Sequence, residues 1–253
     1  MNRPSILTAV STEIRKQRRG IAWLPIASLI LAAVMVASGW YSYQSFTEEF
    51  VQQGVTWVAI WSNAALLYGG LVMPILLGLH AAWQMRMEHA LGNVARLRST
   101  GLISSALIPG KLGAGLIASA VTTGMVGIVY VIAGLLSGFQ PDAELLRTLC
   151  YLALGCVGGW STAALMLVFA SLVRSFAVTV GISVLVAVSG FGVIFVAPAL
   201  QWLWPPSQIG LGMHVRDAMT LDPIQTAIFL VINAVIIAVC GMLSAWILRR
   251  RES

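Results

Sequence analysis

Ser161, in the segment GGWSTA, is the first candidate for covalent chemistry in this chain. A serine hydroxyl acts as a nucleophile only when a base lies within hydrogen-bonding reach. The segment belongs to a long apolar run, and no suitable histidine is expected at the same membrane depth on another run. We therefore interpret Ser161 as a residue that hydrogen-bonds between helices, and we predict no intramembrane hydrolase.

The other residues with catalytic or ligating potential are dispersed. His80, His89 and His214 are far apart in the sequence, which disfavours a metal site. The three cysteines lie in apolar runs without metal-ligand spacing, as is typical of small packing residues. Neither a GxxxxGK(S/T) phosphate loop nor an HExxH motif occurs. We expect no catalytic residue, metal or cofactor in this chain, and no enzymatic activity.

Composition assigns the chain to the membrane. Of its 253 residues, 58% are hydrophobic and only 9% are charged, and the mean hydropathy is +0.88. A soluble domain carries roughly 25% charged residues. Continuous apolar runs of ~20 residues require spanning helices, because a helix satisfies its own backbone hydrogen bonds in lipid. The predicted fold class is an all-α polytopic membrane protein.

Six such runs organise the chain. A leader of residues 1–20 precedes a single six-span domain, residues 21–253. The predicted spans are about 21–39, 55–83, 107–136, 146–173, 176–197 and 224–248. Pro74 predicts a kink in the second span, which is longer than a bilayer requires. Two polar segments interrupt the pattern: residues 84–106 between spans two and three, and residues 198–223 between spans five and six.

Basic residues are distributed unevenly over the predicted loops. With six spans, both termini lie on one side of the membrane. Of the 15 Lys and Arg residues, 13 fall on that side, and Arg147 and Arg216 fall on the other. The positive-inside rule therefore predicts cytoplasmic termini. The net charge of +6 then reflects topology and contacts with lipid headgroups, and we predict no binding to nucleic acid.

The leader is predicted to form an interfacial helix on the cytoplasmic surface. Ile6, Leu7, Val10 and Ile14 share one helical side. The charged residues assigned to this helix are Glu13, Arg15, Lys16, Arg18 and Arg19. A second interpretation stays open, in which the leader is a simple basic anchor that fixes the orientation of the first span.

The segment 84–106 is the longest polar, basic interruption in the chain. As a helix, it would carry Met87, Ala90, Leu91, Val94 and Leu97 on one side, and Arg86, Glu88, His89, Asn93 and Arg96 on the other. A short amphipathic helix between two spans is a natural docking surface for a soluble partner.

The segment 198–223 is too polar and too rich in proline to span, yet apolar enough to enter the interface. Two interpretations stay open: a partly re-entrant outer gate, or an amphipathic loop that lies on the outer leaflet. The residues assigned to the gate are Trp202, Trp204, Pro205 and Pro206.

No charged residue lies near the centre of any predicted span. Ion-coupled transporters and channels usually carry such groups, because buried ionisable residues are costly and are kept for function. A six-span protein without them is expected to take its energy from a partner, and the segment 84–106 is where that partner would dock.

The order of these features resembles the membrane subunit of ABC-2-type exporters, the type V ABC transporter fold, over the whole chain. The matching positions are Glu88, Gly92, the run Val94-Ala95-Arg96-Leu97-Arg98-Ser99, Pro109 and Lys111. The segment Glu13-Ile14-Arg15-Lys16-Gln17-Arg18 also looks like that family's acidic-then-basic start. The chain departs from the family at Gly101-Leu102-Ile103, where a proline often follows the small residue.

The resemblance implies a multi-pass permease of a bacterial plasma membrane that dimerises with a second copy or a paralogue. It would dock a cytoplasmic ABC ATPase, which would bind ATP and Mg²⁺. The residues implied in ATPase coupling are Glu88, Leu91, Gly92, Val94, Arg96, Leu97, Arg98, Ser99 and Lys111. The exported substrate would be amphipathic: a peptide antibiotic, a lipid or a lipid-linked molecule. The chain length is similar to that of permeases that protect bacteria from lantibiotics, although polysaccharide and teichoic-acid exporters share the architecture.

A second function class stays open: a membrane sensor or assembly scaffold without a transport path. It would keep the six spans and need no ATPase, so copurification of a stoichiometric ATPase distinguishes the two classes.

Overall fold

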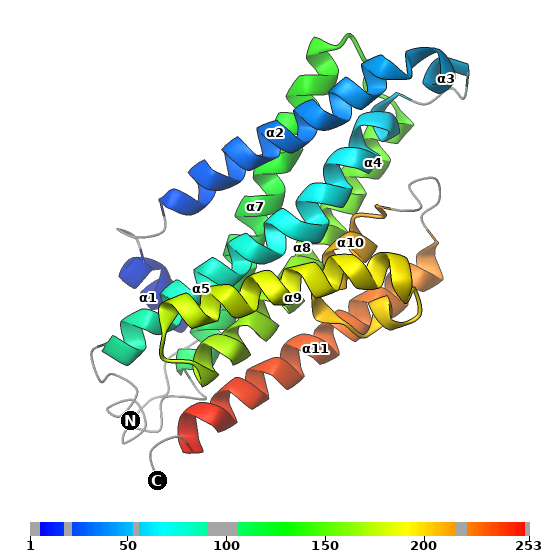
Figure 1. The fold of residues 1–253 in the computed structure, drawn as a ribbon. Helices are drawn as coiled ribbons and strands as arrows, with labels where there is room; N and C mark the ends of the chain where they lie inside the picture. Colours follow the sequence, from blue (N-terminus) through cyan, green and yellow to red (C-terminus); the bar gives the residue numbers. More distant parts are fainter. Residues whose placement is uncertain (1–5, 18–21, 53–55, 91–105, 216–221, 251–253) are drawn as a thin grey trace.

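The computed structural model describes residues 6–17, 22–52, 56–90, 106–215 and 222–250. In these residues six helices are long and apolar enough to cross a bilayer, which confirms the predicted fold class. The elements are α1 (Ile6–Gln17), α2 (Trp23–Ser45), α3 (Thr47–Gln52), α4 (Trp57–Leu67), η1 (Tyr68–Val72), α5 (Met73–Ala90), α7 (Ile108–Leu136), α8 (Ala143–Leu172), α9 (Phe176–Val196), η3 (Leu200–Trp202), η4 (Pro205–Ser207), α10 (Gln208–Gly212) and α11 (Pro223–Arg250). Figure 1 shows the spans as one tilted bundle.

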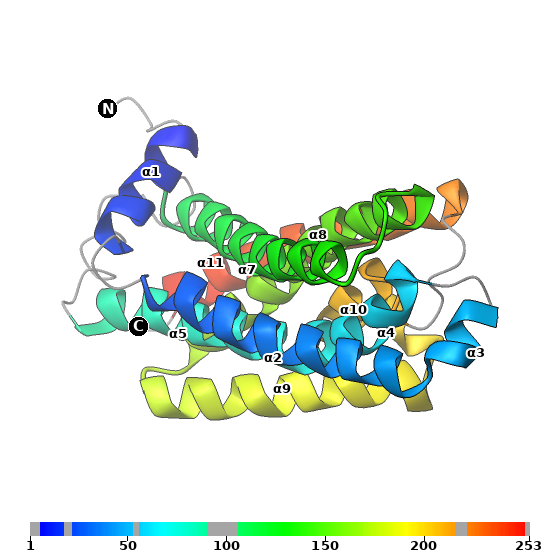
Figure 2. The ribbon, with the colours of Figure 1, turned by 90° about the horizontal axis from the view of Figure 1, so that it is seen from above.

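Helix α8 is the scaffold of this bundle. It packs against α5, α7, α10 and α11, while α2 packs on α4 and α7, and α9 packs on α5 (Figure 2). The buried face of α8 includes Gly155, Gly158, Gly159, Ala163 and Ala164. Such small residues let helix backbones approach closely, and packing of this kind drives helix association in lipid.

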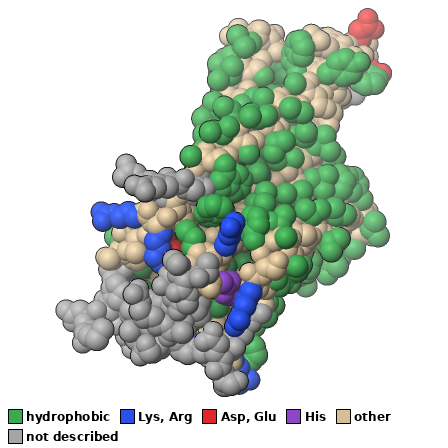
Figure 3. Space-filling view, turned by 60° about the vertical axis from the view of Figure 1, so that its left-hand side comes forward, with side chains coloured by type: hydrophobic (Ala, Val, Ile, Leu, Met, Phe, Trp, Pro, Cys, Tyr) green, Lys and Arg blue, Asp and Glu red, His purple; other side chains and the backbone are tan. Residues whose placement is uncertain are grey.

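The two ends of the bundle differ in charge. Helix α1, the last turn of α5 and the C-terminal end of α11 lie at one end (Figure 1). Lys and Arg side chains gather at this end in Figure 3, whereas acidic side chains project from the opposite end beyond a broad hydrophobic surface. We call the end that carries α1 the basic end.

The second span is built from α4, η1 and α5 in direct succession. The π-helical turn η1 ends two residues before Pro74, the position at which the sequence predicts a kink. Proline has no N–H to donate, and a π turn re-routes the backbone hydrogen bonds around such a gap. Tyr68, in this turn, is buried, and its hydroxyl donates to the Thr122 carbonyl at 2.9 Å.

After α9 the chain turns back into the bundle. The short elements η3, η4 and α10 follow one another, and α10 packs against α8. Pro205, Pro206 and most of α10 are buried, while Trp202 and Trp204 are half-buried. Residues 198–215 thus form an insertion that packs inside the bundle, and we call them the re-entrant segment. Residues 216–221 lie outside the described part of the chain, and the role of the segment as a gate stays a prediction.

Side chains of neighbouring spans hold this re-entrant segment through its carbonyl groups. Thr162 Oγ1 donates to the Pro205 carbonyl at 2.8 Å, and Trp61 Nε1 donates to the Met213 carbonyl at 3.0 Å. Asn233 Nδ2 donates to Gln208 Oε1 at 2.9 Å. Irregular backbone at membrane depth is tolerated where protein groups satisfy it in this way.

Gly158 of α8 lies where the re-entrant segment comes closest, since a Cβ atom there would overlap the Gln208 carbonyl. We expect Gly158→Ala to displace α10 and cost about 1–3 kcal/mol, as overpacking does. The measurement is the melting temperature of the purified protein in detergent, with a fall of at least roughly 2 °C expected. Gly124→Ala is the control, because nothing lies within 4 Å of the added atom. Equal melting temperatures for the two variants would contradict this account of the packing.

Candidate functional site: a buried charge cluster at the basic end

Helix α1 docks on the first turns of α7 through small residues. A Cβ atom at Gly110 would lie 2.9 Å from the Ala9 carbonyl, and a Cβ atom at Gly113 would overlap the side chain of Val10. Because both positions are glycine, the two helices can approach this closely.

The buried side of α1 consists of Ala9, Glu13 and Gln17, at i, i+4 and i+8. It is not the apolar side that the sequence suggests. Leu7 is 82% exposed and Ile14 is 40% exposed, so these two residues are open to lipid or to the interface. Helix α1 therefore turns Glu13, together with Ala9 and Val10, toward the protein, and it turns Leu7 and Ile14 toward its surroundings.

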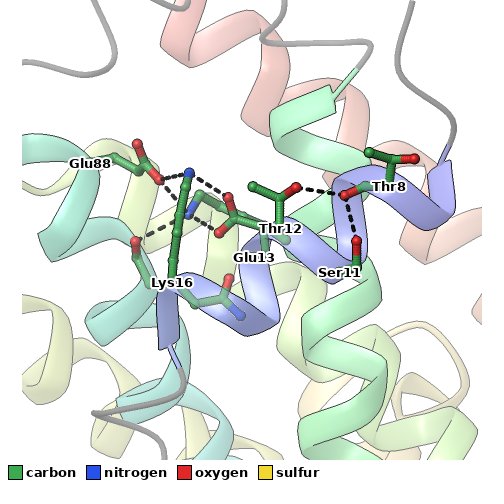
Figure 4. Close-up of polar contacts among 8 residues, drawn as sticks. Thr8, Ser11, Thr12, Glu13, Lys16 and Glu88 are labelled. Atoms are coloured by element: carbon green, nitrogen blue, oxygen red, sulfur yellow. Dashed lines mark hydrogen bonds and ion pairs between the residues drawn. The ribbon is translucent and has the colours of Figure 1, made fainter.

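Glu13 belongs to a cluster of four charged residues contributed by three elements. Figure 4 shows Glu13, Lys16 and Glu88 of this cluster. Lys111 Nζ of α7 lies 3.0 Å from Glu13 Oε2 and 3.3 Å from Glu88 Oε1. Lys16 Nζ of α1 lies 2.8 Å from Glu13 Oε1 and 3.1 Å from Glu88 Oε1. Lys111 Nζ also donates to the Gln84 carbonyl at 3.2 Å. We call Glu13, Lys16, Glu88 and Lys111 the charge cluster.

Three members of the charge cluster are almost fully buried: Lys111 and Glu88 are 1% exposed, and Glu13 is 3% exposed. Burying an ion is expensive unless opposite charges and hydrogen bonds compensate it. Here two ammonium groups face two carboxylates, so the buried charges balance. Each member is therefore tolerated at this depth only while its partners are in place.

Lys16 lies at the exposed edge of the cluster. Burial alone would lower the pKa of Lys16, but the hydrogen bonds and charges of Glu13 and Glu88 raise it by more. The pKa of Lys16 consequently lies above its ordinary value. Lys16 therefore keeps its positive charge at physiological pH and continues to compensate the two carboxylates.

The structure unites residues that the sequence assigns to two separate elements. Glu88 and Lys111 belong to the predicted ATPase-coupling set, and Glu13 and Lys16 belong to the predicted leader. Glu88, one of the predicted coupling residues, is buried against α1 and α7. Arg15 is exposed on α1. Seven predicted coupling residues and two leader residues lie outside the described part of the chain: Leu91, Gly92, Val94, Arg96, Leu97, Arg98, Ser99, Arg18 and Arg19.

Sequence reasoning missed the pairing of the leader with the other two cluster residues. A signal for it does exist, because Glu13 is the only acidic residue before Glu48, in a leader crowded with basic residues. A single acidic residue among basic residues indicates an ion pair with a specific partner. Lys111, at the start of the predicted third span, is a candidate for that partner.

Ser161 and the histidines and cysteines were the other residues considered for chemistry in the sequence. Ser161 is buried, and its hydroxyl donates to the Gly158 carbonyl of its own helix at 2.9 Å. In the described part of the chain, no three His, Cys, Asp or Glu residues come together as metal ligands.

A comparison with protein families matches residues 9–190 to the family described as "ABC-2 family transporter protein". The matched range covers well over half of the chain and includes all four residues of the charge cluster. The chain belongs to the ABC-2 transporter family. It is thus a multi-pass membrane protein and a permease component of an ABC transporter, a role that is not itself catalytic. A comparison with curated proteins finds no match.

Within this ABC-2 permease, Lys111→Met tests the charge cluster. The variant leaves Glu13 and Glu88 facing each other with only Lys16 between them, and breaking a buried ion pair costs about 3–5 kcal/mol. We expect a lower melting temperature in detergent. The double variant Glu88→Gln/Lys111→Met should lose less, because it also removes one uncompensated carboxylate.

The matched control is Arg15→Met, which removes an exposed positive charge from the same end of the protein. It should leave the melting temperature unchanged. If Lys111→Met behaved like Arg15→Met, the charge cluster would not hold α1 in place.

Proposed function

We propose that this ABC-2 permease is the membrane subunit of an ATP-driven exporter and that a separate cytoplasmic ATPase supplies the energy. One observation carries the proposal: the charge cluster ties together the last turn of α5, the first turn of α7 and α1. These contacts lie at both ends of the predicted docking segment 84–106, since Glu88 belongs to its first part and Lys111 follows its last residue.

The cluster makes these three elements move together. A displacement that a partner imposes on the docking segment would reach spans two and three through α5 and α7, and would reach α1 through the ion pairs. Packed helices of this kind switch between discrete arrangements and do not deform continuously. In this proposal the basic end is cytoplasmic, as the positive-inside rule predicts, and ATP and Mg²⁺ bind on the partner.

An amphipathic substrate suits this permease best: a peptide antibiotic, a lipid or a lipid-linked molecule. A groove of about 540 Å³ between α7 and α8 is lined almost entirely by apolar residues, among them Ile128, Leu149 and Leu152. Such a surface favours a molecule that enters from the bilayer over a hydrated ion. The re-entrant segment, with Trp202, Trp204, Pro205 and Pro206, would close the outer end, and a second copy or a paralogue would complete the pathway.

Arg96→Glu tests the docking of the ATPase. Like charges brought together at an interface cost several kcal/mol, so we expect association with the ATPase to weaken at least about tenfold. The measurements are the stoichiometry of the copurified ATPase and the rate of ATP hydrolysis by the reconstituted complex. Arg147→Glu, a charge reversal at the other end of the bundle, is the control. Unchanged ATP hydrolysis in a correctly inserted Arg96→Glu permease would contradict the docking role.

The substrate class is tested on the same reconstituted complex. We expect a lantibiotic or a lipid-linked saccharide to raise ATP hydrolysis, and potassium chloride at matched ionic strength to leave it unchanged. The alternative function, a membrane sensor or scaffold, predicts instead that no ATPase copurifies and that no amphipathic compound changes hydrolysis.

A further inference from the structure

A second groove, of about 690 Å³, opens between α7 and α11 over the surface of α8. Leu112 of α7 and Ala238 of α11 line its two sides. Trp160 of α8 also lines it, and the Trp160 indole N–H donates to the Leu112 carbonyl at 2.9 Å. The two helices lie close together at Gly241, where a Cβ atom would lie 2.9 Å from Leu112 Cδ1. This volume falls in the range of sites that bind small molecules.

The groove is amphipathic along its length. Among the described residues, its lining carries one charged residue, Arg249, which is exposed on the last turn of α11 at the basic end. Beside it, the ring of Trp246 is half exposed and lies 4.5 Å below the guanidinium of Arg250. In the described part of the chain, the linings of the groove between α7 and α8 and of a further groove between α2 and α7 carry no charged residue. The charge at one end sets this groove apart from those two.

The dimensions of the groove match one leaflet of a bilayer. Its lining on α11 runs from Ala234 to Arg249, a helical rise of about 22 Å. Half of the hydrocarbon core measures about 15 Å, and the headgroup region adds roughly 5–7 Å. A phospholipid that lies along the groove would thus place its acyl chain beside Ala238 and its phosphate beside Arg249.

We propose that this groove binds an anionic glycerophospholipid from the leaflet at the basic end. A guanidinium presents paired N–H donors that match two phosphate oxygens, and an indole ring favours the headgroup level. Arg249, the arginine in the lining, selects for net negative charge, because basic residues near the surface attract anionic lipids. Lys111 takes no part, since its ammonium is committed to the charge cluster.

This inference requires that the chain lies in a membrane, but it does not require an ATPase partner. It therefore stands or falls separately from the proposed transport function.

The test is native mass spectrometry of the purified permease in detergent, after incubation with equal amounts of phosphatidylglycerol and phosphatidylcholine. We expect the protein to retain phosphatidylglycerol with a roughly fivefold preference, as one interfacial cation supplies. Ala238→Trp fills the groove and should abolish retention of this lipid. Val239→Trp is the matched control, because Val239 is exposed on the neighbouring position of α11 and does not line the groove.

Arg249→Gln tests the charge without changing the groove. It should bring the ratio of retained phosphatidylglycerol to phosphatidylcholine close to one. Arg15→Gln, at an exposed position of α1, should leave the preference for phosphatidylglycerol unchanged. Equal behaviour of Ala238→Trp and Val239→Trp, or an unchanged preference in Arg249→Gln, overturns the proposal. A change in oligomeric state of Ala238→Trp with an unchanged lipid count would overturn it too, and would assign this face to a second copy of the chain.

Discussion

The burial of two carboxylates with two ammonium groups is the constraint on which the basic end of this protein depends. Glu13, Glu88 and Lys111 are almost inaccessible, and each would be costly at this depth without its partners. If any one of α1, α5 and α7 moved away, buried charges on the other two would lose their compensation, so the cluster holds the three helices together. An apolar contact of the same area would resist separation but would tolerate sliding. An ion-pair network with directional hydrogen bonds tolerates neither, which is consistent with the proposed transmission of movement through these helices.

The opposite half of the bundle is held in a different way. There the re-entrant segment is fixed through its backbone carbonyls, which accept hydrogen bonds from Thr162 and Trp61. These hydrogen bonds go to the backbone, so they do not use the side chains of the segment. The side chains of Trp202 and Trp204 are therefore left for other contacts. Close approach at Gly158 and Gly212 adds shape complementarity. The protein thus combines an ionic joint at one end with a packed, hydrogen-bonded insertion toward the other.

The sequence predicts six spans because hydrophobicity over ~20 residues is a local property, and six helices of the described residues are long and apolar enough to cross a membrane. Asp142 and Ser175 cap two of them, as their side chains accept bonds from the first turn. The charge cluster could not be predicted in full, since it depends on which face of α1 meets α7. Periodicity places Leu7 and Ile14 together but does not say whether protein or lipid covers them. The glycines at 110 and 113 decide this, and their effect is tertiary.

The same distinction between protein and lipid explains how basic residues are used at this end of the molecule. Lys111 is buried among helices, where its charge is neutralised by carboxylates from two elements. Arg249 lines the end of a mostly apolar groove, where the proposed phospholipid would place its phosphate. A lysine suits the first setting because its compact ammonium can turn toward several acceptors, and an arginine suits the second because its planar guanidinium matches phosphate. Counting basic residues predicts orientation alone; the surroundings of each residue determine whether it joins helices or meets lipid.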